Sequence, residues 1–474
     1  MRFLEILIPV FLAIYFFWPL TRRKRSPAIN ILPTFSIVLL INHYTIEGWR
    51  WQMIPLYILT IFTFLVTLPN FLRKKGEDED SGPRPSLLQT LGLALLLAVS
   101  VALPSLLPVP SIPKPDGPFS VGTTSFELVD EARAERYAQS PGPRRLMVQV
   151  WYPAKPGPDD KLAPWMDSAE IFAPALSDFI KMPAWFLDHL KYAKTSSYQN
   201  AAADTANGPY PLILFSHGWR GFREQNTFQM QELASRGYVV ASIQHTYGAI
   251  LTVFPDGTIA PNNPSALPSG VPQDEYDAAA RALVNQWSED IAYTLDTLAQ
   301  WNNSDPQGRF SGLLDLERVG AMGHSTGGGA AIQFCAKDAR CKAGLTMDAF
   351  MTPVAETTLE NGIRQPFLYL FSQVWADDAG SKNNRLFDRF YSHLGQPAPV
   401  FTVLGTNHYD FSDLPALSPL APQLGLKGPL NGGRVQEILL AYTRAFFDQQ
   451  FRDVKSPLLE GPSADYPEMR YEQR

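Results

Sequence analysis

Four long apolar runs within the first 110 residues constrain this chain more than any other feature. They cover Phe3–Leu20, Ile29–Ile46, Trp51–Leu72 and Leu87–Leu107. An α-helix rises about 1.5 Å per residue, so roughly 20 apolar residues cross a hydrocarbon core about 30 Å thick. No polar face at helical spacing interrupts the runs, which argues against core helices of a soluble domain. Residues 1–110 are therefore expected to form a membrane region of about four transmembrane helices.

The second run is the weakest of the four. Asn30, Asn42 and His43 lie within it, and Glu47 follows its end. Polar groups are costly inside a membrane helix, so whether Ile29–Ile46 truly spans stays open from the sequence. A cleaved signal peptide at the N-terminus is disfavoured, because several spans follow the first.

Basic residues in the connecting loops predict how the spans are oriented. The first loop, Thr21–Pro27, reads TRRKRSP, and the third, Arg73–Pro85, reads RKKGEDEDSGPRP. The second loop, Glu47–Gln52, holds one Arg and one Glu. Positively charged loops stay on the cytoplasmic side. Four spans therefore place both termini, and everything after Leu107, on the extracytoplasmic side, whereas three spans would separate the two basic loops.

A proline-rich stretch separates the apolar runs from the rest of the chain. Pro104–Pro118 reads PSLLPVPSIPKPDGP, which disfavours a helix and favours an extended spacer. Residues 111–118 are assigned as the linker and residues 119–474 as the second domain. The chain has 40 basic and 46 acidic residues, a net charge of -6. It has no concentrated basic face, so no nucleic-acid partner is expected.

The second domain alternates short apolar strands with longer helical stretches. Strands that are apolar on both faces and alternate with helices are typical of a mostly parallel sheet covered by helices, so the expected fold class is α/β. The polar segment Pro255–Pro272 is expected to be a surface loop. Expected strands are Arg145–Pro153, Tyr210–Gly218, Tyr238–His245, Arg318–His324, Ala343–Asp348, Pro366–Ser372 and Pro399–Gly405. Expected helices are Glu224–Arg236, Asp274–Trp301, Thr326–Lys337 and Val435–Phe451.

The segment Arg318–Ala330, RVGAMGHSTGGGA, holds a serine where an expected strand meets an expected helix. Gly323 and Gly327 flank Ser325 in the pattern Gly-x-Ser-x-Gly, which in a strand–turn–helix forms a nucleophile elbow. Glycines allow the close backbone approach of so tight a turn, and the helix start offers unpaired N–H groups with a partial positive charge. Ser325 is the predicted nucleophile, and the backbone N–H of Thr326 is a predicted oxyanion donor.

A serine nucleophile needs a base and an acid that orients the base. Asp348 follows Ser325 by about one helix, a turn and a short strand, which places it at the tip of the adjacent strand. His408 lies in the loop after the last expected strand, so the order is Ser, Asp, His. His393 remains an alternative base, and Asp348 could instead be a cap or turn residue. His245 is expected to shape the pocket or to bond backbone groups.

The loop Ser216–Phe222, SHGWRGF, follows an earlier strand and is expected to supply the second oxyanion donor. Its glycines let the backbone turn inward, and the N–H of Trp219 is the predicted donor. A simple glycine turn is the alternative. The chain shows no metal-ligand cluster and no cofactor motif, so neither a metal nor a cofactor is expected.

These segments resemble the plasma-type platelet-activating-factor acetylhydrolase family within the α/β-hydrolases. The matching pieces are PLILFSHGWRGFR, LASRGYVVASIQH, RVGAMGHSTGGGA, LTMDAFMTP and NHYDFSD, spread over roughly Phe119 to Phe451. The resemblance implies an α/β-hydrolase fold and a calcium-independent serine esterase that cleaves short or oxidised acyl chains from the middle position of phospholipids. It carries the nucleophile, acid, base and two oxyanion donors to Ser325, Asp348, His408, Trp219 and Thr326.

The chain also departs from that family. Thr326 stands where family members usually have Phe. Trp219 and Arg220 replace smaller residues, and their side chains would narrow the acyl side of the pocket or add a positive charge that binds a phosphate. The elbow also resembles that of cutinase-like polyester hydrolases. An esterase acting on other esters, and a ligand-binding sensor with a hydrolase-like domain, therefore remain alternatives. The expected partners are an ester or phospholipid substrate and a lipid bilayer.

The two cysteines, Cys335 and Cys341, lie six residues apart near the end of the elbow helix. Outside the cytoplasm such a pair can form a disulfide, which would fix the loop leading to the strand of Asp348. Two buried free thiols are the alternative.

Overall fold

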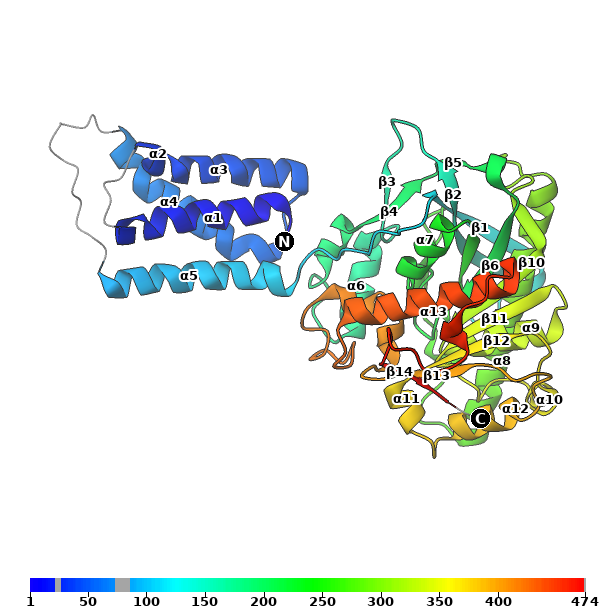
Figure 1. The fold of residues 1–474 in the computed structure, drawn as a ribbon. Coiled ribbons are helices and arrows are strands. Elements are labelled where there is room, and N and C mark those ends of the chain that lie inside the picture. The colour runs from blue at the N-terminus through cyan, green and yellow to red at the C-terminus, as the bar shows by residue number, and fades with distance from the viewer. Residues whose placement is uncertain (22–26, 73–85, 473–474) are drawn as a thin grey trace. The chain divides into compact units, whose positions relative to one another are not determined.

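The computed structural model describes residues 1–21, 27–72 and 86–472, which divide into two compact units (Figure 1). The first unit consists of the described residues of Met1–Pro110 together with the short segments Asp188–Ala193 and Leu417–Leu420. The remaining residues from Ser111 onward form the second unit. The basic stretches behind the predicted orientation, residues 22–26 and 73–85, lie outside the described part of the chain.

Helices make up the first unit. Among the described residues, four helical segments are long and apolar enough to cross a membrane, judged by length and composition: Phe3–Thr21, Ala28–Glu47, Trp51–Pro69 and Leu87–Leu106. Each overlaps one of the apolar runs seen in the sequence. The helices are α1 (Phe3–Phe17), α2 (Pro27–Asn30), α3 (Leu32–Asn42), α4 (Ile54–Leu72) and α5 (Leu87–Leu106).

One face of α1 packs against later helices of the first unit, and its exposed residues are apolar too. Ile8, Leu12 and Phe16 are buried at a spacing of four residues, which puts them on one stripe of the helix. They join buried side chains of later helices, whereas Ile6 and Val10 are exposed. Apolar groups on the outer surface are what a helix facing lipid requires.

Polar side chains in the first unit are paired with one another. Glu5 and Arg50 are both buried and form an ion pair with Nε–Oε1 at 2.7 Å. His43, one of the residues that weakened the second run, is buried as well. Its Nε2 lies 2.7 Å from the hydroxyl of Tyr57 on α4, and its Nδ1 lies 3.0 Å from a carboxylate oxygen of Glu47. These partners offset the cost of burying the polar groups of that run.

The predicted spacer begins later than its prolines suggested. Helix α5 continues through Pro104 to Leu106, so the expectation of a non-helical segment from Pro104 is wrong at its start. Proline here removes one hydrogen bond near the end of a helix, where few turns depend on it. No regular element follows until Ser120 in the described chain.

A twelve-stranded sheet organises the described part of the second unit. The strand order is β14-β13-β12-β11-β10-β6-β7-β2-β1-β4-β3, with β5 paired to β2. The strands from β7 to β13 run parallel across five successive pairs. The antiparallel pairs lie toward the two edges. The central bounds are β6 (Tyr210–Ser216), β7 (Val239–Gln244), β10 (Leu314–His324), β11 (Cys341–Met347), β12 (Phe367–Ser372) and β13 (Val400–Val403).

The long N-terminal hairpin and the short edge strands complete the sheet. Only part of the hairpin, Arg145–Pro153, was expected from the sequence. The strands are β1 (Ser120–Ala134), β2 (Pro143–Lys155), β3 (Leu162–Pro164), β4 (Lys194–Gln199), β5 (Ala202–Ala203) and β14 (Met469–Tyr471). A separate two-stranded ribbon joins β8 (Leu251–Val253) to β9 (Ile259–Pro261). The segment Pro255–Pro272 is therefore not only loop, because β9 lies within it.

Helices cover both faces of the sheet (Figure 1). Helix α8 contacts α9, and α7 contacts α13. The main apolar core joins alternate residues of β6, Leu212 and Leu214, to Trp287 and Ile291 of α8. The expected α/β-hydrolase arrangement is confirmed. The helices are α6 (Ala169–Phe179), α7 (Thr227–Ser235), α8 (Gln273–Asn303), α9 (Thr326–Lys337), α10 (Glu356–Asn361), α11 (Gln373–Asp377), α12 (Lys382–Tyr391) and α13 (Gly432–Arg452).

Candidate active site

Ser325 stands at the sharp turn between β10 and α9. Its φ is 57° and its ψ is -121°, a conformation that an L-residue rarely adopts and that marks stored strain. The Ser325 N–H donates to the carbonyl of Met347 at 2.9 Å, and the N–H of Phe350 donates to the Ser325 carbonyl at 2.9 Å. The turn is thus held to the end of the neighbouring strand β11. This is the geometry of a nucleophile elbow.

The two glycines beside Ser325 are required by space. A Cβ added to Gly323 would lie 2.2 Å from the carbonyl oxygen of Gly327. A Cβ added to Gly327 would lie 2.1 Å from the carbonyl oxygen of Ser216, at the end of β6. Backbone atoms cannot yield as a flexible side chain can. The turn between β10 and α9 therefore needs glycine at position 323, and the close approach of α9 to β6 needs glycine at position 327.

Asp348 and His408 form the hydrogen-bonded pair that the sequence predicted. Asp348 follows β11 and is fully buried, and its Oδ2 lies 2.9 Å from Nδ1 of His408. Its carboxylate also accepts from the backbone N–H and the hydroxyl of Ser372, both at 2.7 Å. His408 stacks on Trp375 with ring centroids 4.7 Å apart. The ring is therefore oriented from two sides, with its proton on Nδ1 and Nε2 left as the acceptor.

The alternative base is remote from this arrangement. His393 follows α12, and its Nδ1 bonds to the carbonyl of Arg389 at 2.8 Å. It does not line the pocket that contains Ser325 and His408.

Two backbone N–H groups are placed where the sequence expected oxyanion donors. Trp219 follows Gly218 in the loop after β6, and Thr326 is the first residue of α9. Neither N–H takes part in a hydrogen bond within the described residues. The first N–H groups of a helix have no intrahelical acceptor, so Thr326 remains able to donate to a ligand.

Gln225 connects the loop after β6 to the elbow, a role that the sequence did not reveal. Its Oε1 accepts from the N–H of Gly218 at 3.2 Å, and its Nε2 lies 3.0 Å from Nδ1 of His324. The other ring nitrogen of His324 lies 3.0 Å from the carbonyl oxygen of His408. The amide donates to Nδ1, so Nε2 carries the proton and donates to that carbonyl. Burial lowers the pKa of His324 well below its usual value, and the nearby His408 adds to this effect.

Another serine, histidine and aspartate are hydrogen bonded in series beneath the same loop, and they are closed to solvent. His245 lies 2.8 Å from the hydroxyl of Ser216 through Nε2 and 2.9 Å from Asp290 through Nδ1. All three residues are 0% exposed, so no substrate reaches them. The N–H of His245 donates to His217, whose Nδ1 lies 2.7 Å from the carbonyl of Gly218. His245 therefore supports the backbone of the pocket loop, one of the two roles expected for it.

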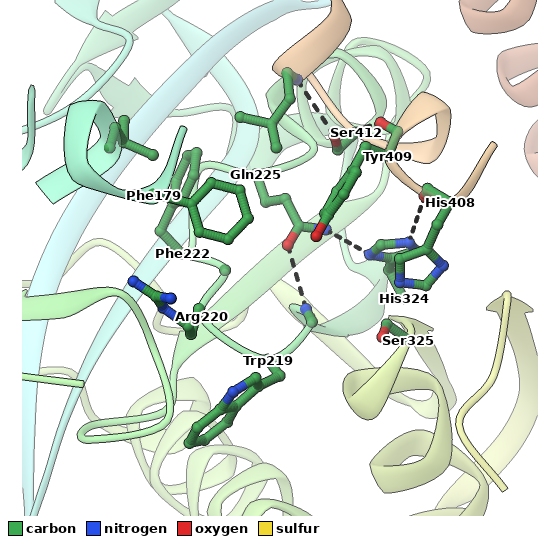
Figure 2. Close-up of a pocket in the computed structure, with 14 residues that line it drawn as sticks. Phe179, Trp219, Arg220, Phe222, Gln225, His324, Ser325, His408, Tyr409 and Ser412 are labelled. Carbon is green, nitrogen blue, oxygen red and sulfur yellow. Dashed lines mark hydrogen bonds between the residues drawn. The ribbon is translucent and has the colours of Figure 1, made fainter. Parts of the chain in front are cut away.

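The pocket above Ser325 has a volume of about 190 Å³ and opens to solvent. Figure 2 shows Ser325, His324 and His408 on one side and Phe179 and Arg220 on the other. Apolar and aromatic side chains make up much of the wall, as in most small-molecule sites. The lining residues are Leu176, Phe179, Gly218, Trp219, Arg220, Gly221, Phe222, Gln225, His324, Ser325, His408, Tyr409, Ser412 and Leu414.

The side chains of His324, Asp348 and His408 lie close enough to be considered as metal ligands. Their donor atoms already serve other partners, because Asp348 accepts from His408 and Ser372 while both nitrogens of His324 are hydrogen bonded. Hydrogen bonding within the protein accounts for this cluster. The two cysteines form a disulfide, Cys335–Cys341, at the end of α9.

Comparisons with known proteins indicate the family of the chain. The profile of the family described as platelet-activating factor acetylhydrolase, isoform II, matches residues 108–457. A platelet-activating factor acetylhydrolase from Cavia porcellus is 27% identical over 376 residues, which is 74% of this chain and 81% of the relative. A probable 1-alkyl-2-acetylglycerophosphocholine esterase from Arthroderma benhamiae is 27% identical over 76% of this chain and 92% of its own length.

A solved structure leads to the same class of protein. The ferulic acid esterase from Streptomyces cinnamoneus superposes with a TM-score of 0.63 and 27% sequence identity. The match covers 77% of this chain and the whole of that one. Both the sequence relatives and this neighbour are named as enzymes that act on esters. The chain therefore belongs to the family of platelet-activating factor acetylhydrolase, isoform II, and is an ester hydrolase with an α/β-hydrolase fold.

Proposed function

We propose that the chain is a membrane-anchored serine esterase that uses Ser325, His408 and Asp348 as a catalytic triad. The observation that carries the proposal is the 2.9 Å bond from buried Asp348 to His408, in a pocket that also exposes the strained Ser325. A charge-paired histidine beside an elbow serine is the arrangement that acyl transfer requires.

The reaction follows from the roles of these groups. The hydroxyl of Ser325 attacks the ester carbonyl carbon while Nε2 of His408 takes its proton. The carbonyl oxygen becomes an oxyanion, which accepts from the N–H groups of Trp219 and Thr326. Collapse of this intermediate breaks the bond to the alcohol, which leaves with the proton from His408. A water molecule, deprotonated by His408, then releases the carboxylic acid and restores Ser325. Asp348 stabilises the imidazolium in both steps.

The proposed substrates are phospholipids with a short or oxidised acyl chain at the middle position. The names of the Cavia porcellus and Arthroderma benhamiae relatives support this substrate class. The bounded pocket favours short acyl groups, and four apolar helices would hold the enzyme at a bilayer. We further propose that the catalytic unit lies on the extracytoplasmic side, where a Cys335–Cys341 disulfide is stable.

Kinetics of purified variants test the triad. We expect Ser325→Ala to lower kcat on p-nitrophenyl acetate by roughly 10⁴-fold or more, and Asp348→Asn by about 10⁴-fold, because the wrong histidine tautomer results. Ser392→Ala is the matched control, since this exposed serine does not line the pocket. Activity that survives in a folded Ser325→Ala variant would reject the assignment.

A different ester is the second candidate for the substrate, and the match to a ferulic acid esterase favours it. Graded p-nitrophenyl esters, a feruloyl ester and phospholipids with a two-carbon or sixteen-carbon middle chain distinguish the two. The proposal expects kcat/KM to be highest for the phospholipid with the two-carbon chain. A preference for the feruloyl ester would support the second candidate, and a lack of turnover on all of them would support a ligand-binding role.

A further inference from the structure

Arg220 has a backbone conformation that residues other than glycine rarely adopt. Its φ is 57°, in the left-handed region where glycine is favoured. Its N–H donates to the carbonyl of Gly248 at 2.9 Å, and the N–H of Gly221 donates to Gly218 at 2.8 Å. A glycine at position 220 would form this turn without strain. Strain of this kind, when retained in a pocket, points to a role for the side chain.

The guanidinium of Arg220 lies in the pocket wall and has no counter-ion among the described residues. Its Cζ lies 5.2 Å from the centre of the Phe179 ring. Its Nε is buried and has no hydrogen-bond partner among the described residues. The residues that line the pocket include no carboxylate. The other basic group buried there, His324, has a pKa lowered well below its usual value by burial, so it is neutral and Arg220 is the cation of the wall.

A partly buried cation without a partner is destabilised by the loss of hydration, unless a ligand supplies an anion. We propose that Arg220 binds an anionic oxygen group in the alcohol part of the ester substrate, either a phosphodiester or a carboxylate. The planar guanidinium offers a fork of N–H donors that matches such groups. This inference rests on the proposed function, because it takes Ser325 as the place where the ester is cleaved.

The place of Arg220 in the pocket suits this role. Figure 2 shows Arg220 beside Phe179 and across the pocket from His408. An ester whose carbonyl meets Ser325 can therefore extend its alcohol part toward Arg220. Tyr409 also borders the pocket. Burial raises the pKa of its phenol, and the charge of Arg220 opposes that rise. The phenol stays neutral, so Tyr409 does not neutralise the arginine.

Three acetyl esters test the proposal on the full-length, detergent-solubilised enzyme. They are neutral p-nitrophenyl acetate, 4-acetoxybenzoate with a carboxylate, and a 2-acetyl glycerophosphocholine with a phosphodiester. The readout is the ratio of kcat/KM for each anionic ester to that for the neutral ester. We expect Arg220→Met to lower this ratio about 10- to 100-fold, as loss of a charge-assisted hydrogen bond does. Dimethyl phosphate should inhibit the wild type competitively and the variant much more weakly.

Lys181→Met is the matched control for general attraction of anions. Lys181 is exposed, follows α6 and does not line the pocket, so its loss should leave the ratio unchanged. A fall for the phosphodiester alone would identify a phospholipid headgroup as the ligand. A fall for both anionic esters would identify anionic esters in general.

The outcomes separate this inference from the proposed function. An unchanged ratio in an active Arg220→Met variant would overturn the role of Arg220 and leave the triad intact. A wild type that cleaves none of the three esters would instead reject the proposed function. If Arg220→Met does not fold, Arg220→Gly replaces it, because glycine suits the φ of 57°.

Discussion

At the scale of the residue, the turn at Ser325 depends on how closely helix α9 approaches strand β6. A Cβ on Gly327 would lie 2.1 Å from the carbonyl oxygen of Ser216, so α9 approaches β6 this closely only with glycine at this position. We predict that Gly327→Ala destabilises the protein by about 2–4 kcal/mol, since the backbone must shift to relieve the overlap. Gly328→Ala is the control, because its nearest contact would be 3.0 Å, and we expect a smaller loss. Chemical unfolding measures both, and equal losses would contradict the steric role.

The stability of the protein at acid pH also depends on a single residue, His324. His324 stays neutral when folded because burial lowers its pKa well below the usual value, whereas it protonates near pH 6.5 once unfolded. A lowered histidine pKa means that the unfolded state binds more protons, so this contribution to stability is complete above pH 6.5 and is lost as the pH falls below it.

We therefore predict that the stability advantage of the wild type over His324→Gln shrinks by about 1.4 kcal/mol between pH 8 and pH 5.5, the cost of protonating one unfolded histidine. Glutamine can keep the bonds to Gln225 and to the carbonyl of His408. Urea unfolding at the two pH values measures the change. An advantage that stays constant or grows at low pH would show that His324 is charged in the folded state.

At the scale of the element, a buried ion network joins α8 to the strands beneath the pocket. Asp290 bonds to both Arg144 of β2, at 2.6 Å, and His245, at 2.9 Å. Burial alone would raise the pKa of Asp290, but Arg144 and His245 hold it below its ordinary value. The carboxylate is therefore charged, and it neutralises an arginine that is itself 1% exposed.

We predict that Asp290→Asn destabilises the protein by about 3–5 kcal/mol, because it leaves the Arg144 cation buried without its main partner. Asp296→Asn on the same helix is the control. Its partner Arg340 is solvent-exposed, so we expect a loss of less than about 1 kcal/mol. Thermal unfolding compares the variants. Equal losses of stability would show that the buried ion pair of Asp290 stabilises the protein no more than the exposed pair of Asp296.

Local signals in the sequence were enough to place several elements and not others. Helix α9 matches its expected bounds because the glycines that follow Ser325 and the apolar run both lie within it. Helix α7 was expected from Glu224 but begins at Thr227. The reason is tertiary, since Asp413 accepts from the N–H of Thr227 at 2.8 Å and caps the helix from far along the chain. Strand β1 was missed because SVGTTSFELVDEARA mixes polar and apolar residues without strict alternation.

The candidate site was likewise predictable from the sequence only in part. The positions of Ser325, Asp348 and His408, the proposed triad, were predictable because each residue follows a strand at a recognisable motif. The roles of Gln225 and His324 were not, because their bonds join residues 99 and 84 positions apart along the chain. Sequence spacing has no signal for such pairs. The departure of Arg220 from a smaller residue was visible, but its lack of a counter-ion emerges only from the packed pocket.

At the scale of the whole molecule, the proposed membrane anchor also predicts the side of the membrane on which the catalytic unit lies. The basic loops predict an extracytoplasmic C-terminus. We predict that an epitope appended after Arg474 is bound by antibody on intact cells, without permeabilisation. An epitope inserted at Gly76, in the third loop, is the control and should be bound only after permeabilisation. The opposite pattern would reverse the proposed topology.

The central claim is that Ser325 is an activated nucleophile. Its most direct test is covalent labelling of the folded, full-length protein with a fluorophosphonate, followed by mapping of the modified residue by mass spectrometry. The account predicts one label per chain on Ser325, no label in Ser325→Ala, and full labelling of Ser412→Ala, which removes another hydroxyl of the same pocket. A folded wild type that remains unlabelled, or a label on any other serine, would contradict it.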